Sequence, residues 1–320
     1  MPELPDITVY VEGIRNLACS QPLLALRVKS LFFLRSVDPP PDAFVGRRLE
    51  GVHRVGKRIA MEFEGDLYAV IHLMIAGRLH WTPGDDRLVG SNQTADASTG
   101  HASAQGSSRF PANGIAAFDF PNGTLFVTEA GTKHRASLHL VHGTGALTAF
   151  DRGGVSVFDD TPEAFASALR RENRTVKRAL TDPAIVDGIG NAYSDEILHR
   201  ARMSPYAQTR SLDDTEIERL RSAAVEVLGE WIDRLRKEAG PALPAKVIAF
   251  HKEMAVHGKY GKPCPVCGTP VQRLVYAENE ANYCPTCQTG GKVLADRALS
   301  RLLKDDWPRT LDELEQLKKR

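Results

Sequence analysis

Long hydrophobic runs and a secretory signal are both missing from this sequence. No stretch reaches the roughly 18 apolar residues that a membrane-spanning helix needs. The opening residues, MPELPD, lack the basic stretch and the apolar core of a signal peptide. These absences argue against a membrane protein and against a secreted one. We therefore expect a soluble intracellular protein.

A surplus of charge of either sign is also missing. The chain has 41 Lys and Arg against 40 Asp and Glu, a net charge of +1. Such a balance neither indicates nor excludes a nucleic-acid partner, so any surface for one must be a local basic patch. One candidate is a cluster that is equally typical of a solvated helix face, formed by Arg170, Arg171, Arg174, Lys177 and Arg178.

Cysteine is scarce, and its placement is uneven. Cys19 stands alone in an apolar-flanked stretch, where we expect a packed thiol. The other four form two Cys-x-x-Cys pairs separated by 16 residues, Cys264 with Cys267 and Cys284 with Cys287. Two such pairs provide four thiolates for one tetrahedral ion, and the missing secretion signal favours a metal over disulfides.

The segment between the two cysteine pairs indicates which metal site this is. It reads VQRLVYAENEANY, which predicts two short strands joined by a polar turn. The sequence therefore predicts a zinc-ribbon hairpin with one structural Zn²⁺, whose four ligand positions the protein fills. An iron–sulfur cluster or a redox pair would not account for the hairpin.

The first half of the chain has the pattern of a β-rich domain. Residues 6–18 have helical spacing, and short β-rich runs follow from Leu23 to about Leu140. Their alternation, with turn pairs such as Asn122-Gly123, predicts an antiparallel sandwich behind a leading helix. Residues 85–113 have no periodicity, so we expect a flexible, disordered insertion there.

The second half has helical periodicity. Thr161 and Pro162 are typical of an N-cap and a first helical position, and further helices are predicted at about 174–181, after the Gly188–Asn191 turn, and at 213–238. The predicted class is α+β, with a sandwich domain at 1–150, a helical domain at 151–261, the zinc ribbon at 262–290 and an extension at 291–320.

Five short motifs carry a family resemblance. They are MPELPD at the start, RVGKRI around Lys57, HLMIAG at 72–77, GIGNAYSDEIL at 188–198 and YCPTCQ at 283–288. Alone, each has an ordinary explanation, such as a capping segment, a solvated lysine or a helix N-cap. Together and in this order, they resemble the formamidopyrimidine-DNA glycosylase and endonuclease VIII family. The resemblance implies a helix–two-turn–helix element within the helical domain.

The amino terminus has the chemistry that this resemblance implies. Removal of Met1 would leave Pro2 with a free α-amino group, which titrates near ~8 and so has a neutral fraction at pH 7. Such an amine can attack the anomeric carbon of a nucleotide and form an iminium. Glu3 could then protonate the sugar oxygen. By resemblance, Lys57 would assist Pro2, and Asp6 stands where the family usually has Glu.

The residues expected at the DNA depart from the family pattern more than the catalytic ones. By resemblance, Lys177 and Asn191 would bind phosphates. Ile75 replaces a methionine that fills the void in the duplex, and Asn279 replaces an arginine that grips the target phosphate. The wedge Arg and Phe are absent from the next loop, where the candidates are Lys133, His134 and Arg135.

The resemblance implies a base-excision-repair enzyme, a DNA glycosylase with abasic-site lyase activity. Its partner would be double-stranded DNA with a damaged base or an abasic site, and we expect a monomer in the bacterial cytoplasm, at the nucleoid. The lesion stays open because the base-holding groups are altered. One alternative is a non-catalytic damaged-DNA-binding protein, which the missing ribbon arginine favours. A zinc-ribbon protein that binds protein or RNA is the other, and the glycine-turn helix pair opposes it.

Overall fold

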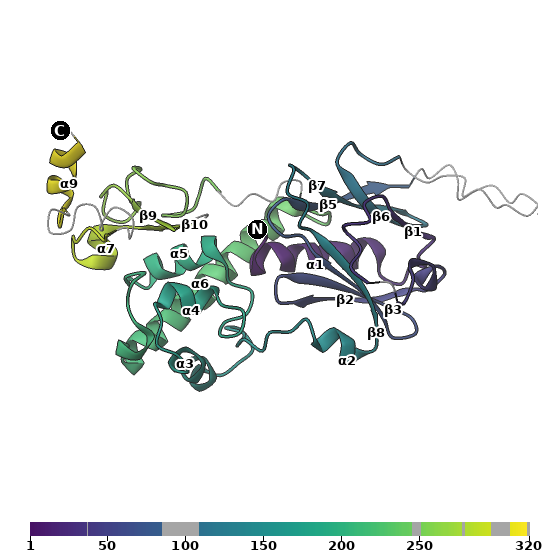
Figure 1. Ribbon diagram of the computed structural model, residues 1–320, viewed down its shortest axis with the longest axis horizontal. Helices are drawn as coiled ribbons and strands as arrows, with labels where there is room; N and C mark the ends of the chain where they lie inside the picture. The colour runs from purple at the N-terminus through teal and green to yellow at the C-terminus, as the bar shows by residue number, and fades with distance from the viewer. Residues whose placement is uncertain (37, 85–108, 245–250, 277–278, 296–307, 319–320) are drawn as a thin grey trace, which may run out of the picture. The chain divides into compact units, whose positions relative to one another are not determined.

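The computed structural model of the protein describes residues 1–36, 38–84, 109–244, 251–276, 279–295 and 308–318, drawn as a ribbon in Figure 1. These residues divide into two units. The first unit is Met1–Asp151 with Ile232–Val247, and the second is Arg152–Trp231 with Ile248–Arg320. Each unit has its own sheets or helices and is described separately below.

The chain begins with helix α1, Leu4–Ala18, which starts two residues earlier than the predicted 6–18. The earlier start has a local cause, because Glu3 is the N-cap residue and Pro5 lies in the first turn, where a missing N–H costs nothing. The buried stripe that faces the first unit's core includes Ile7, Tyr10 and Ile14. The predicted amphipathic helix is therefore present.

Two four-stranded antiparallel sheets form the rest of the first unit's framework. One has the order β1-β6-β7-β5 and the other β2-β3-β4-β8. A single apolar core joins residues from both sheets and from α1, so the predicted sandwich is confirmed. The strands of the first sheet are β1 Ala25–Val28, β5 Gly77–Pro83, β6 Gly114–Phe120 and β7 Gly123–Glu129. Those of the second are β2 Leu49–Val55, β3 Arg58–Phe63, β4 Leu67–His72 and β8 Ser137–His142.

Two tight hairpins set the registers of these sheets. Phe120 pairs with Gly123, which confirms a turn here, although its two central residues are Pro121 and Asn122, one position before the predicted Asn122-Gly123 pair. Val55 pairs with Arg58, so a two-residue turn of Gly56 and Lys57 joins β2 to β3. Gly56 has φ +61°, a conformation that glycine adopts without strain at the first central position of a hairpin turn. This turn places Lys57 at the tip of the hairpin.

One predicted strand is shorter than its sequence suggested. The run LRVKSLFFL forms β1 only as far as Val28, because the N–H groups of Lys29 and Ser30 both donate to the carbonyl oxygen of Ile115 and the chain then turns. Leu31 and Phe32 consequently project into solvent, with 82% and 75% of their surface exposed. Most of the predicted flexible insertion, residues 85–108, lies outside the described residues, and residues 109–113 lead into β6.

The second unit contains the predicted helices and the hairpin. The Thr161 hydroxyl accepts a hydrogen bond from the Ala164 N–H at 3.2 Å, which confirms the predicted cap. The helices are α3 Pro162–Arg170, α4 Val176–Thr181, α5 Asn191–Arg200, and α6 Asp214–Ala239, which continues into the first unit. The hairpin is β9 Gln272–Tyr276 with β10 Asn279–Tyr283, followed by α7 Pro285–Thr289 and, after a gap in the description, α9 Leu311–Lys318.

The described residues also include short helices, namely the 3-10 helices η1 Pro41–Phe44 and η3 Thr209–Ser211 and the α-helix α2 Thr144–Thr148. Cys19 is half-buried against the first unit's core, as expected for a packed thiol. Within the described residues, no helix combines the length and the apolarity needed to cross a membrane. The α+β class is thus confirmed, with a sandwich, a helical region and a cysteine-bearing hairpin.

Candidate active site and zinc centre

The amino terminus brings two buried carboxyl groups together. Glu3 and Asp6 are 4% and 5% exposed and form a capping box at the start of α1. In this box the backbone N–H of Glu3 donates to Asp6 Oδ2 at 2.8 Å. The other carboxyl oxygen, Asp6 Oδ1, is buried without a hydrogen-bond partner among the residues that the structure describes. Pro2 is buried beside them.

Burial at the amino terminus shifts two pKa values in opposite directions. Burial raises the pKa of Asp6 to about 7, and the charge of Glu3 adds to this, while the Glu3 N–H opposes it. Burial also lowers the pKa of the chain's amino group. The positive charges of Arg78 and Lys57 lower this pKa further, while the two carboxylates raise it. The structure thus gathers an amine, two carboxyl groups and two cations in one place.

His72, at the end of β4, lies close enough to Lys57 for the charge of that lysine to act on it. Burial lowers its pKa to about 4, and the positive charges of Arg58 and Lys57 act in the same direction. The imidazole is therefore neutral at pH 7 and available as a hydrogen-bonding group rather than as a charge.

Ile75 lies on a tight turn between β4 and β5. Its side chain is 63% exposed, and the preceding residue, Met74, has φ +51°. The Gly77 N–H closes the turn by donating to the Leu73 carbonyl oxygen at 2.8 Å. A Cβ added to Gly77 would lie only 2.3 Å from the same oxygen. Only glycine fits there. The turn therefore holds an apolar side chain out toward solvent, on a backbone with little freedom.

The segment predicted to complete the wedge is folded around Glu129. The buried carboxylate of Glu129 accepts hydrogen bonds from the N–H groups of Arg135 and Ala136 at 2.8 and 2.9 Å. It also forms an ion pair with His134, Oε2 to Nδ1, at 3.5 Å. This arrangement exposes Lys133, His134 and Arg135 on one loop. The Ala130 N–H, which bonds to the Ala76 carbonyl oxygen at 3.3 Å, joins the loop to the Ile75 turn.

In the second unit, the ammonium of Lys177 is buried. Its Nζ donates to Asn191 O at 2.8 Å, to Ser194 Oγ at 2.9 Å and to Asp195 Oδ1 at 2.5 Å. An ammonium has three donors, so all of them have acceptors within the protein. Asp195 in turn accepts from His257 Nδ1 at 2.7 Å. A direct phosphate contact by Lys177 would have to replace one of its three bonds.

Asn191 and Asn279 are the first residues of α5 and β10, two elements that a hydrogen bond joins. The Asn191 side chain donates through Nδ2 to the carbonyl oxygen of Glu280 at 2.8 Å, so the first residue of α5 is tied to β10. Asn279 is the first residue of β10, and its side chain lies outside the described part of the molecule. The structure therefore brings the predicted phosphate-binding residue Asn191 to the hairpin strand that begins with Asn279.

The four ribbon cysteines converge as predicted. Their Sγ atoms lie within 4.8 Å of one another, at 3.9 Å for Cys264 and Cys287 and 3.4 Å for Cys267 and Cys284. A tetrahedral zinc with Zn–S bonds of about 2.3 Å needs sulfurs about 3.8 Å apart, so the set fits one Zn²⁺. His199 Nε2 lies 3.2 Å from Cys264 Sγ, as a donor to a metal-bound thiolate would.

The candidate basic patch is largely compensated. Arg170 is paired with Asp214 at 2.6 Å, Arg174 is held by Asp182 at 2.6 Å and by Glu172, and Arg171 donates to a backbone carbonyl oxygen. These contacts agree with the solvated-face alternative more than with an open cationic surface.

Sequence reasoning missed several residues that shape the site. Arg78 acts on the amino terminus, Asp195 and His199 connect α5 to the ribbon, and Glu196 connects it to the segment before the ribbon. The carboxylate of Glu196 accepts three backbone N–H groups, from Ala255, Val256 and His257. A signal did exist, because an Asp-Glu pair in a helix that is otherwise buried needs partners. The partners themselves are distant in sequence and could not be read from it.

Comparison with known protein families matches three parts of the chain. Residues 1–110 match the formamidopyrimidine-DNA glycosylase N-terminal domain, and residues 157–239 match the H2TH domain of the same family. Residues 261–290 match the zinc finger found in FPG and IleRS. These matches cover the amino-terminal cluster, helices α3 to α6 and the four cysteines.

Individual relatives extend over most of the chain. A formamidopyrimidine-DNA glycosylase of Thermus thermophilus is 31% identical over 302 residues, 91% of this chain and all of the relative. An uncharacterized formamidopyrimidine-DNA glycosylase-like protein of Mycobacterium tuberculosis is 40% identical over 151 residues, which is 47% of this chain and 94% of that protein. The Lactococcus lactis Fpg solved with abasic-site DNA has a TM-score of 0.74 at 21% identity, covering 90% of this chain and 99% of that one.

Proposed function

This chain belongs to the formamidopyrimidine-DNA glycosylase family, and we propose that it is a bifunctional DNA glycosylase and abasic-site lyase. Its substrate would be double-stranded DNA with a damaged base or an abasic site. The observation that carries the proposal is the amino-terminal cluster, where the half-buried amino group of the chain, with a lowered pKa, lies among Glu3, Asp6 and Lys57.

The Pro2 amine is the proposed nucleophile. After removal of Met1, its nitrogen would occupy a setting like the one that lowers the pKa of the present amino group, so more of it would be neutral at pH 7. The nitrogen lone pair attacks C1′, and the damaged base leaves with the glycosidic electron pair and takes a proton. The nitrogen then loses its proton and the C1′–O4′ bond opens, which leaves an iminium.

The carboxyl groups and Lys57 have separate roles in this scheme. Glu3 delivers the proton to O4′ as the ring opens. Asp6, half-protonated near neutral pH, holds the Glu3 backbone through the N–H bond to Oδ2 and adds less than a full second negative charge. Lys57, at its hairpin tip, contributes a positive charge for the target phosphate. The iminium is an electron sink, so a base can remove a C2′ proton and the 3′ phosphate leaves by β-elimination, with δ-elimination to follow.

The proposed DNA contacts come from both units. Asn191 contacts a phosphate, and Lys177 supports that contact through its bond to the Asn191 carbonyl oxygen. Ile75 enters the space left by the everted base, helped by Lys133, His134 or Arg135 on the neighbouring loop. Asn279 contributes at most a neutral contact where a charged one is usual, which removes a charge-assisted hydrogen bond worth about 1.5–3 kcal/mol.

The relatives support DNA as the partner and damage as the target. The Lactococcus lactis Fpg was solved with DNA containing an abasic site, and a mutant of it was solved with DNA containing Fapy-dG. Those lesions are ligands of the Lactococcus lactis protein. The residues of this chain that would hold the base differ from the family pattern, so we assign no particular lesion to it. We propose a monomer that acts at the nucleoid in the bacterial cytoplasm.

Borohydride trapping tests the proposed reaction. The protein is incubated with a duplex containing one abasic site, and borohydride reduces any iminium to a stable adduct. We expect an adduct with the unaltered protein and at least tenfold slower trapping with Pro2→Gly, equivalent to about 1.4 kcal/mol. Pro40→Gly makes the same change at an exposed proline of the same unit and should trap normally.

Duplex binding separates the nucleophile from a binding role. Pro2→Gly should bind the same duplex with nearly unchanged affinity, because it removes no charged or aromatic contact. Equal losses of trapping and of binding would contradict the nucleophile assignment. The second candidate is a non-catalytic damaged-DNA-binding protein, and the neutral Asn279 position is the observation in its favour. Tight binding by the unaltered protein without an adduct would support this candidate.

A further inference from the structure

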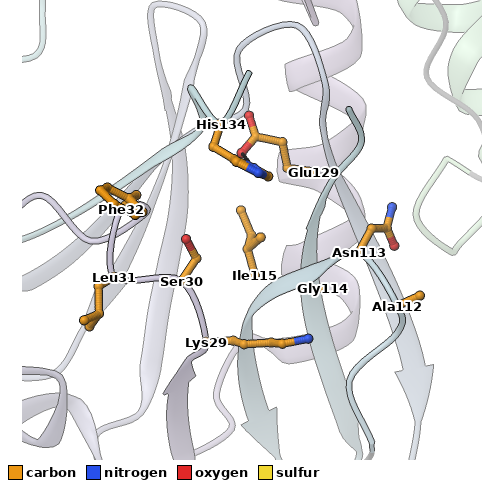
Figure 2. A pocket seen from close by; sticks show the side chains of 10 residues that line it. All are labelled: Lys29, Ser30, Leu31, Phe32, Ala112, Asn113, Gly114, Ile115, Glu129 and His134. Carbon is orange, nitrogen blue, oxygen red and sulfur yellow. Dashed lines mark ion pairs between the residues drawn. The ribbon is translucent and has the colours of Figure 1, made fainter. Parts of the chain in front are cut away.

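A hollow of about 480 Å³ opens on the first unit beside the His134 loop (Figure 2). Ile115 forms its floor, and Leu31 and Phe32 stand on one side where the chain turns away after β1. Phe32 is 75% exposed and is not packed into the first unit's core. Large exposed apolar side chains next to a concave surface are typical of a binding site.

Polar groups line the rim of this hollow. Figure 2 shows the His134 imidazole and the Glu129 carboxylate on one side, the Asn113 amide on another and the Ser30 hydroxyl facing the interior. The side chain of Lys29 runs along the lower edge. An apolar floor, an aromatic side chain and hydrogen-bonding groups at the edge are what a nucleobase requires, because its faces stack and its edges donate and accept.

Two backbone links place the hollow next to the Ile75 turn. Glu129 pairs with Gly77 in the β5–β7 ladder, and the Ala130 N–H bonds to the Ala76 carbonyl oxygen. The same two paired strands, β5 and β7, therefore position both the Ile75 turn and the hollow. The nearby cations Lys29, Lys133 and Arg135 are exposed and suit a phosphate backbone beside the hollow.

We propose that this hollow binds the base opposite the lesion, turned out of the helix and stacked on Phe32. The inference rests on the proposed function, because only eversion of the damaged nucleotide leaves an unpaired partner. A base without a partner costs little to unstack, and Ile75 occupies the vacated space. Asn113, Ser30 and His134 contact the edge of the base, and Lys29 and Arg135 contact its flanking phosphates.

Affinities for two duplexes test the proposal. The first duplex contains one tetrahydrofuran abasic analogue opposite a normal base, and the second contains two such analogues opposite each other. We expect the unaltered protein to bind the first duplex about 5- to 100-fold more tightly, the range that one aromatic–base stack provides. Phe32→Ala should remove this difference, and Leu24→Ala, an exposed apolar side chain of the same unit, should retain it.

A second variant fills the hollow instead of removing the stacking partner. Ser30→Trp should abolish the difference between the two duplexes as Phe32→Ala does, since the indole would occupy the volume of the base. Equal affinities of the unaltered protein for both duplexes would overturn the proposal, as would a difference that survives both variants. Comparing each variant on both duplexes cancels any general loss of folding or binding.

The two proposals fail by different readouts. If the unaltered protein forms no borohydride adduct with a natural abasic site, the proposed enzymatic function fails. If it forms the adduct and binds the two analogue duplexes equally, only the hollow's role fails. A base-dependent difference without an adduct would retain the hollow as the base-binding site of a protein that does not catalyse.

Discussion

At the scale of single residues, Asp6 has an environment that is unusual for a carboxyl group. It is buried at the start of α1, where one oxygen accepts the Glu3 N–H and the other has no partner among the described residues. A helix amino terminus favours a negative charge, yet burial outweighs this and raises the pKa of Asp6 to about 7. Asp6 is therefore half-protonated near neutral pH.

This shift links folding stability to pH. Between about pH 4, where an unfolded Asp titrates, and pH 7, the folded state holds a proton that the unfolded state has lost. The free energy of unfolding therefore falls as pH rises through this window, by up to about 1.4 kcal/mol for each pH unit. Asp6→Asn keeps an oxygen for the Glu3 N–H and removes the titration.

Urea unfolding between pH 5 and pH 8 measures this effect. We expect Asp6→Asn to become progressively more stable than the unaltered protein as pH rises. Asp42→Asn, at an exposed position of the same unit, should follow the unaltered protein. Parallel pH profiles for Asp6→Asn and the unaltered protein would show that Asp6 ionises normally.

At the scale of elements, α5 organises the second unit. Along this one helix, Asn191 bonds to β10, Asp195 to His257, Glu196 to three backbone N–H groups, and His199 to Cys264. The contacts to β10 and to Cys264 tie the ribbon to α5, and the contacts of Asp195 and Glu196 hold residues 255–257, which lead into the ribbon. The ribbon itself has only a small apolar core, which includes two of its cysteines, so its fold depends on the metal.

Removal of zinc should therefore act on the ribbon first. A strong chelator should disorder residues 262–290 and lower the affinity for abasic-site DNA, while the sandwich of the first unit stays folded. Amide hydrogen exchange reports each region separately, and readdition of Zn²⁺ should restore both protection and affinity. Unchanged affinity in metal-free protein would mean that the ribbon is not part of the DNA surface.

Elements with local signals could be predicted from the sequence, and those set by distant contacts could not. Thr161-Pro162, Asn122-Gly123 and the cysteine spacing each require only neighbours in the chain, and each prediction is confirmed, with the turn one position earlier than predicted. The early end of β1 depends on the Ile115 carbonyl oxygen, 86 residues beyond Lys29, and the role of α5 depends on the ribbon. Periodicity carries no information about such partners.

The same limit applies to the candidate site. Pro2, Glu3, Asp6 and Lys57 could be named from motifs, because their chemistry follows from residue type and position. The Asp6 pKa, the neutral His72 and the enclosed Lys177 ammonium follow from burial, which only the folded chain defines. The roles of the named residues in catalysis and DNA binding stay predictions.

At the scale of the whole molecule, a net charge of +1 means that DNA affinity depends on which cations are left uncompensated. Arg200 is engaged by Glu226 and Glu230, with distances of 3.1 and 2.8 Å. Arg135 is exposed, and its N–H, rather than its guanidinium, is bonded to Glu129. Arg135 is therefore the better candidate for a phosphate contact.

Salt dependence distinguishes these two kinds of arginine. Each phosphate contact adds about 0.9 to the slope of log affinity against log salt concentration. We expect Arg135→Ala to lower the slope magnitude by about that amount and Arg200→Ala to leave it unchanged. The opposite result would place the DNA surface on α5 and α6 rather than beside the Ile75 turn.

The identity of the atom that bonds to the sugar is the most direct test of the central claim. The borohydride-trapped complex is digested with a protease, and mass spectrometry locates the residue that carries the reduced sugar. We expect the adduct on the α-nitrogen of Pro2, at the start of a chain that has lost Met1. An adduct on the Nζ of Lys57, or on any other lysine, would contradict the proposed mechanism.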